Sequence, residues 1–164
     1  MGQYSYSRKQ LYTMPIKYAH TNIIAQDWRK LVDFYQTVFG CVPVPPQRNQ
    51  SGDWLAKGTG VADAALEGMH LRLPGYGEDA PTLEIYSYRT MLDKPYPAAN
   101  RQGLGHLAFA VDDVQAIRQA ILEHGGADLG DIVERDVEGV GRITFIYMTD
   151  PEGNILEIQH WDTA

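Results

Sequence analysis

Two histidines and two glutamates stand in matching places of the sequence, and together they could bind a metal ion. His20 opens the segment His-Thr-Asn-Ile-Ile, and His106 opens the similar segment His-Leu-Ala-Phe-Ala. Glu84 and Glu157 are each the central residue of a Leu-Glu-Ile tripeptide. Two imidazoles and two carboxylates suit Ni, Co, Zn, Mn or Fe as a divalent ion, and the lack of thiolate ligands disfavours a closed structural zinc site. The pattern predicts one divalent transition metal bound by these four residues, and it predicts no organic cofactor.

The four residues belong to a longer internal repeat, which supplies the elements that must position them. When His20 is placed over His106, Asp27 falls on Asp113 and Gly40 falls on Gly126. Each segment reads as a short strand, an aspartate that can cap a helix, apolar residues at helical spacing and a glycine stop. Each half then offers further strands before its Leu-Glu-Ile segment. We expect them at Asp53 to Lys57 and Gly68 to Leu73 in the first half, and at Arg142 to Thr149 in the second.

Each half therefore predicts the order β-α-β-β-β, and the whole chain predicts an α+β fold. We expect two such modules, related by a pseudo-two-fold repeat, to form a half-open barrel of strands with helices outside. Residues 1–14 read as a leader, and residues 15–162 as a single domain. The domain would comprise a first module at 15–92, a linker at 93–102 and a second module at 103–162.

Side-chain alternation along the strands indicates which residues share a face with the glutamates. Glu84 shares its face with Tyr86 and Tyr88, while Leu83 and Ile85 point the opposite way into a core. We therefore expect Tyr86 and Tyr88 to line a substrate pocket. His70 and His160 have no counterpart in the repeat and are interpreted as ordinary surface or strand histidines.

Composition and charge exclude several classes of function. The net charge is −7 and the basic residues are scattered, which disfavours a nucleic-acid partner. No apolar run reaches the length of a membrane helix, so no membrane partner is expected. The single cysteine, Cys41, cannot form an internal disulfide, and this is consistent with a cytoplasmic protein.

Three stretches resemble the vicinal oxygen chelate superfamily, which includes glyoxalase I, extradiol dioxygenases and bleomycin resistance proteins. They are His20 through Gly40, the segment from Gly103 to Asp113 with the sequence GLGHLAFAVDD, and Asp150-Pro-Glu-Gly-Asn-Ile-Leu-Glu157. The resemblance implies a metal that chelates two adjacent oxygens of a small-molecule substrate. It also implies His20, Glu84, His106 and Glu157 as the ligands, a set that is similar to that of bacterial glyoxalase I.

The resemblance implies a metal-dependent lyase or isomerase that transfers a proton next to a carbonyl, through a metal-stabilised enediolate or enolate. Glu84 or Glu157 would act as the catalytic base. Two alternatives stay open: a small Fe(II) or Mn(II) dioxygenase, and a resistance protein that binds an antibiotic without turnover. The chain departs from glyoxalase I where Ile85-Tyr86-Ser87-Tyr88 replaces an expected asparagine, and where an arginine near His20 is missing; both normally bind glutathione. Sites shared between chains are common in the family, so a homodimer is expected.

Overall fold

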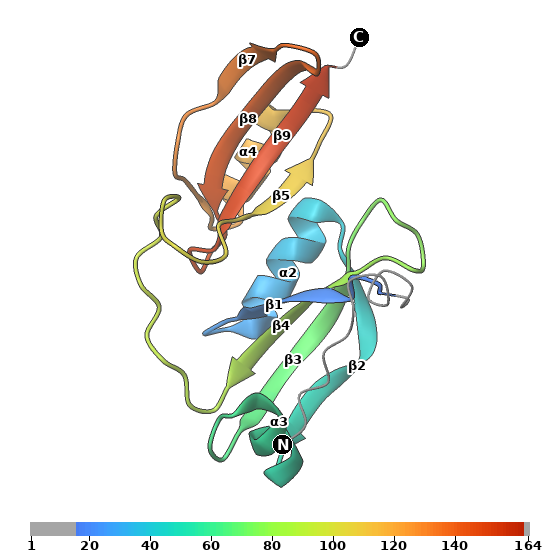
Figure 1. The fold of residues 1–164 in the computed structure, drawn as a ribbon, viewed down its shortest axis with the longest axis vertical. Coiled ribbons are helices and arrows are strands. Elements are labelled where there is room, and N and C mark those ends of the chain that lie inside the picture. The colour runs from blue at the N-terminus through green and yellow to red at the C-terminus, as the bar shows by residue number, and fades with distance from the viewer. Residues whose placement is uncertain (1–15, 163–164) are drawn as a thin grey trace, which may run out of the picture.

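The computed structural model describes residues 16–162, and the predicted leader at residues 1–14 lies outside this range. Its elements form two modules that follow one another along the chain (Figure 1). The first comprises β1 (His20–Ile24), α2 (Trp28–Phe39), β2 (Val42–Ser51), α3 (Asp53–Thr59), β3 (Ala65–Arg72) and β4 (Thr82–Tyr88). The second comprises β5 (Leu107–Ala110), α4 (Val114–Glu123), β6 (Ala127–Asp128), β7 (Val133–Val137), β8 (Gly141–Thr149) and β9 (Ile155–Asp162).

Each module folds around one sheet, and the two sheets have equivalent topologies. The first sheet has the order β1-β4-β3-β2, and the second has the order β5-β9-β8-β6 with β7 also paired to β8. In each sheet the opening strand runs parallel to the strand that carries Leu-Glu-Ile, which is antiparallel to the strand before it. Neither sheet closes on itself. The predicted α+β fold with a repeated module and a half-open barrel is therefore confirmed.

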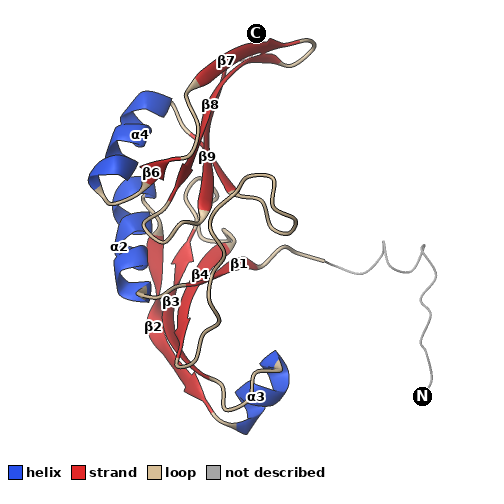
Figure 2. Ribbon diagram, turned by 90° about the vertical axis from the view of Figure 1, so that its left-hand side faces the viewer, coloured by secondary structure: helices blue, strands red, loops and turns tan. Residues whose placement is uncertain are grey.

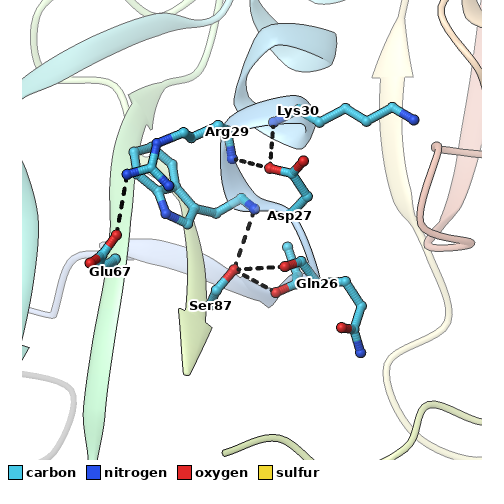
Figure 3. Close-up of polar contacts among 8 residues, drawn as sticks. Gln26, Asp27, Arg29, Lys30, Glu67 and Ser87 are labelled. Carbon is cyan, nitrogen blue, oxygen red and sulfur yellow. Dashed lines mark hydrogen bonds and ion pairs between the residues drawn. The ribbon is translucent and has the colours of Figure 1, made fainter. Parts of the chain in front are cut away.

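Local capping signals explain where the two long helices begin and end. The Asp27 side chain accepts hydrogen bonds from the backbone N–H groups of Arg29 and Lys30 at 3.1 Å, as Figure 3 shows. Asp113 caps α4 in the same way through Ala116 N at 2.9 Å. Gly40 caps the end of helix α2, and its φ of 66° is the left-handed conformation that glycine adopts without strain. The predicted N-caps are therefore confirmed.

One predicted strand in the first module is wrong. Asp53 to Lys57 lies in helix α3, which starts after Gly52 and ends before Gly60, two glycines with positive φ. Only Leu55 of this helix is buried, so its sequence lacks the repeated apolar spacing that would have indicated a helix. The sequence does not indicate strand β2, because this segment contains three prolines, which an edge strand such as β2 can accept.

Both long helices pack on the same side of the sheets, and this leaves the opposite faces of both sheets open (Figure 2). A single apolar core runs between the helices and the sheets of both modules. At the junction, the rings of Phe39 and Phe109 stack with centroids 4.0 Å apart. Helix packing thus fixes the two sheets in one curved layer whose open face is available for a site. Within residues 16–162, no helix has the length and apolarity needed to cross a bilayer.

Candidate metal centre

The open face of the first sheet brings His20 and Glu84 together. His20 is the first residue of β1 and pairs with Thr82, while Asn22 pairs with Glu84 in the adjacent parallel strand. His20 Nδ1 lies 3.4 Å from Glu84 Oε1. The Glu84 side chain is 12% exposed and that of His20 is 46% exposed. The carboxylate is therefore held in the sheet, and the imidazole stands at the edge where a further partner can reach it.

The second sheet carries the equivalent pair. His106 lies just before β5, and its Nε2 atom is 2.8 Å from Oε2 of Glu157 in β9. Tyr147 is the β8 partner of Glu157, and its ring centroid lies 4.9 Å from that of His106. Tyr147 was not singled out from the sequence, because its place opposite Glu157 depends on the register between β8 and β9.

The structure therefore assembles the four predicted ligands as two pairs, one on each sheet. Across residues 16–162, no three histidine, cysteine, aspartate or glutamate side chains are arranged so that they could hold an ion. His20 and His106 stand at the start of the opening strands, and Glu84 and Glu157 are each the third residue of β4 and β9. The open faces of the two modules turn to the same side, as Figure 2 shows. Two sheets that lie side by side in one layer do not face each other, so neither pair completes the other in this arrangement.

The structure adds His70 to the first pair. His70 in β3 is the register partner of Glu84, and its Nε2 atom lies 3.1 Å from Glu84 Oε1. The same nitrogen lies 2.5 Å from the Tyr86 hydroxyl. The sequence indicates an ordinary histidine at position 70, because this residue has no counterpart in the repeat. The signal that could have identified it is the pairing of β3 with β4, which the sequence alone does not provide.

Burial and charge shift the pKa values of this cluster. Desolvation lowers the pKa of His70, while the nearby Glu84 carboxylate acts in the opposite direction. Desolvation, and then the charge of Glu84, raise the pKa of Tyr86 to about 12. At neutral pH, Tyr86 therefore keeps its proton, and the cluster favours a neutral His70.

The predicted pocket residues Tyr86 and Tyr88 have different surroundings. Both pack against a small apolar cluster formed by Leu55, Ala64 and Leu66 beneath α3. The Tyr86 hydroxyl also reaches the His70–Glu84 cluster, whereas no such polar contact is made by Tyr88 within residues 16–162. Tyr86 is therefore the tyrosine in direct contact with the candidate centre.

The first sheet gathers donor atoms of the kinds that bind a transition metal, although no three such side chains in the described residues are placed to hold an ion. Glu84 Oε1 lies 3.1 Å from His70 Nε2 and 3.4 Å from His20 Nδ1. A carboxylate and imidazoles are ligands that divalent transition metals accept. The chemistry of the donor types, rather than their present arrangement, therefore suits a divalent transition metal.

A cavity adjoins one part of the candidate centre. It has a volume of about 270 Å³ and lies between β1, the segment after β4 and the start of β5. Asn22, Ile24 and Lys94 line it together with His106, but Glu84 and Glu157 do not. The cavity lies beside the second pair and does not coincide with a four-ligand centre.

Comparisons with known proteins agree with this architecture. A sequence profile of the Glyoxalase/Bleomycin resistance protein/Dioxygenase superfamily matches residues 17–158. No curated protein matches the chain. A glyoxalase family protein from Bacillus cereus has a similar structure, with a TM-score of 0.69, 17% identity, and coverage of 89% of this chain and 93% of that one.

Two further solved structures share the fold. An integron cassette protein from the mobile metagenome of V. Pseudocholerae has a TM-score of 0.53 and 21% identity, and the match covers 92% of this chain and 98% of that one. The fosfomycin resistance protein FosX from Listeria monocytogenes, in complex with Mn(II) and sulfate, has a TM-score of 0.51 and 13% identity. That match covers 91% of this chain and 95% of FosX. At these identities, the similarities show a common fold.

Proposed function

Because the chain belongs to the Glyoxalase/Bleomycin resistance protein/Dioxygenase superfamily, we propose that it is a metal-dependent lyase or isomerase that acts on a small molecule with two adjacent oxygens. The observation that carries the proposal is the recurrence of one His–Glu pair per module. The distances are 3.4 Å for His20 and Glu84, and 2.8 Å for His106 and Glu157. The presence of the same His–Glu pair at equivalent places in the two modules supports a centre built from both modules.

We propose His20, Glu84, His106 and Glu157 as the ligands of one divalent transition ion. When bound, the ion supplies Lewis-acid stabilisation of negative charge on substrate oxygens. His20 and His106 would act as fixed neutral ligands. Glu84 or Glu157 would accept a proton from the substrate carbon and return it at a neighbouring or opposite position. Tyr86, which keeps its proton at neutral pH, is placed to donate a hydrogen bond within the centre.

We further propose that a second copy of the chain completes each centre. The first sheet of one copy would face the second sheet of the other, which brings one His–Glu pair against the other pair. The open face of the second sheet supports this arrangement, because Ala108 and Ala110 of β5 are exposed there beside Glu157 and Gln159. Small exposed residues on an uncovered sheet face leave room for a partner.

Elemental analysis of the purified protein tests the metal, and solvent exchange tests the reaction class. We expect about one equivalent of a transition metal per chain, lost in His106→Ala and in Glu157→Ala but retained in His124→Ala, whose histidine is exposed at the end of α4. Under anaerobic conditions, α-hydroxy carbonyl compounds and acyl thioesters should be screened for deuterium uptake from D₂O. Unchanged metal content in both ligand variants would overturn the centre. If the activity instead consumes oxygen in proportion to product, the protein is a dioxygenase and not an isomerase.

A further inference from the structure

Arg48 lies on the open face of the first sheet, in the row next to the candidate centre. In β2 it pairs with Gly68 of β3, which pairs in turn with Tyr86 of β4. A Cβ atom on Gly68 would come within 2.4 Å of the Tyr86 ring. Glycine at this position therefore leaves room for the Tyr86 ring over β3.

Arg48 is half-buried as a residue, and its guanidinium has no carboxylate partner within 4.0 Å in the described part of the chain. Its hydrogen bond goes to the backbone carbonyl of Pro46. Arg29 behaves differently, since its guanidinium contacts the Glu67 carboxylate at 3.2 Å (Figure 3). A guanidinium without a carboxylate partner can donate its remaining N–H groups to an anion, so Arg48 is available for a ligand.

The strand register places Arg48 beside the candidate centre. Arg48, Gly68 and Tyr86 share one row across the first sheet, and His70 and Glu84 share the next row on the same face.

Building on the proposed function, we infer that Arg48 binds an anionic oxyacid group of the substrate, a carboxylate or a phosphonate, beside the two oxygens that the metal would chelate. Two glutamates neutralise a divalent ion, and the Arg48 charge then leaves the centre positive. A guanidinium presents two parallel N–H donors that match the oxygens of either oxyacid. Arg48 and Glu84 lie on the same sheet, so this inference does not depend on which chain supplies the second sheet.

Three hydroxamates test the inference, because all three offer the metal the same pair of adjacent oxygens. Acetohydroxamate is uncharged elsewhere, succinate monohydroxamate adds a carboxylate, and phosphonoacetohydroxamate adds a phosphonate. Binding to the Co(II)-loaded protein is measured by calorimetry for the wild type, for Arg48→Gln and for Arg89→Gln. Arg89 is exposed just beyond β4, so its variant removes the same charge from the same sheet, away from the centre.

We expect Arg48→Gln to lower the affinity for the preferred anionic probe by about tenfold or more. The affinity for acetohydroxamate should stay within about twofold of the wild-type value. Arg89→Gln should leave all three affinities within about twofold. The anionic probe that loses more affinity identifies the oxyacid. Unchanged binding of both anionic probes to Arg48→Gln would overturn the inference. An equal loss for acetohydroxamate would overturn it too, because the variant would then act through the metal.

Failure of the proposed function gives a separate result. If the wild-type protein takes up no metal, the proposed centre is wrong, and Arg48 is tested in the metal-free protein with phosphonoacetate and succinate as probes. One of these anions should shift the Nε–H resonance of Arg48 in the NMR spectrum, whereas the resonance of Arg89 should not move. If neither anion shifts the Arg48 resonance, the anion site is wrong regardless of the metal.

Discussion

The Tyr35 hydroxyl donates a buried hydrogen bond of 3.0 Å to Asp150 Oδ2, and so connects helix α2 of the first module to the turn before β9 in the second. Asp150 is 2% exposed and also accepts hydrogen bonds from the backbone of Glu152 and from the backbone and side chain of Asn154. Burial raises the pKa of Asp150, and these donors oppose that effect. The junction of the two modules thus contains a polar network within an apolar core.

Tyr35→Phe should lower the free energy of unfolding by about 1–2 kcal/mol, because it removes one donor from a buried carboxyl group and changes the packing little. Chemical denaturation at neutral pH measures the change. Tyr76→Phe is the matched control, since Tyr76 is 71% exposed, and its effect should stay within about 0.5 kcal/mol. Equal stability of the wild type and Tyr35→Phe would show that this bond does not stabilise the junction.

His160 links β9 to the end of β5 and should make stability depend on pH. Its Nδ1 atom lies 2.7 Å from the carbonyl oxygen of Val111, and its Nε2 atom lies 3.2 Å from Asp162 Oδ1. Both partners only accept hydrogen bonds, so both ring nitrogens can donate only in the imidazolium form. The carbonyl of Val111, and then Asp162, raise the pKa of His160.

A histidine whose pKa is higher in the folded protein than in the unfolded chain stabilises the fold when it is protonated. This stabilisation is complete at a pH below the pKa of the unfolded chain, and it is lost as the pH rises through the pKa of the folded protein. The stability of the wild type relative to His160→Gln should therefore be greatest below about pH 6 and should decrease towards about pH 9. Denaturation curves of both proteins across this range measure the difference. Asp162→Asn removes the carboxylate and should reduce the pH dependence. A difference that is constant with pH would contradict the role of the imidazolium.

The sequence predicts those parts of the fold that depend on local signals. Asp27 and Gly40 mark the ends of α2 because a carboxylate caps N–H groups and glycine adopts a positive φ, and both effects act within a few residues. The internal repeat adds the equivalence of the two modules, since similar segments fold alike. Helix α3 lacks such a signal: it is short, and it buries only Leu55.

The candidate site depends on contacts between strands, which local signals do not determine. His70 meets Glu84 only because β3 and β4 pair in one register, and a shift of one residue would turn His70 to the other face. The same limit applies to Arg48, whose place follows a register shift between Val44 and Arg48 in β2. How the two His–Glu pairs meet depends on the arrangement of whole sheets, for which no short segment carries a signal.

A mixture of two inactive variants should restore metal binding if each centre is shared between two chains. The double variant His20→Ala/Glu84→Ala lacks the first pair, and His106→Ala/Glu157→Ala lacks the second. In a mixed dimer, the intact first sheet of one chain would face the intact second sheet of the other, so one complete centre forms. After mixing in denaturant and refolding, we expect about one metal ion for every four chains, because about half of the dimers are mixed.

Each double variant refolded alone is the control, and neither should retain metal. Analytical ultracentrifugation of the wild type should show a dimer. If the mixture stays metal-free while each variant remains folded and dimeric, the centre lies within one chain. A monomeric wild type that binds metal would lead to the same conclusion.

Glu84→Gln should separate metal binding from proton transfer. An amide oxygen can still coordinate a metal, but it cannot accept a proton from carbon. Glu84 has two imidazole neighbours, His20 and His70, within 3.4 Å, whereas His106 is the one imidazole within 4.0 Å of Glu157 in the described residues. We expect Glu84→Gln to reduce the rate of solvent deuterium uptake by about 100-fold or more, because the amide cannot accept the proton. The metal content should fall only slightly, because both imidazoles beside residue 84 remain.

Glu157→Gln is the matched variant, and if Glu157 is the working base, it will show the larger loss of rate. Equal and small losses of rate in both variants, with metal retained, would exclude both carboxylates as the base.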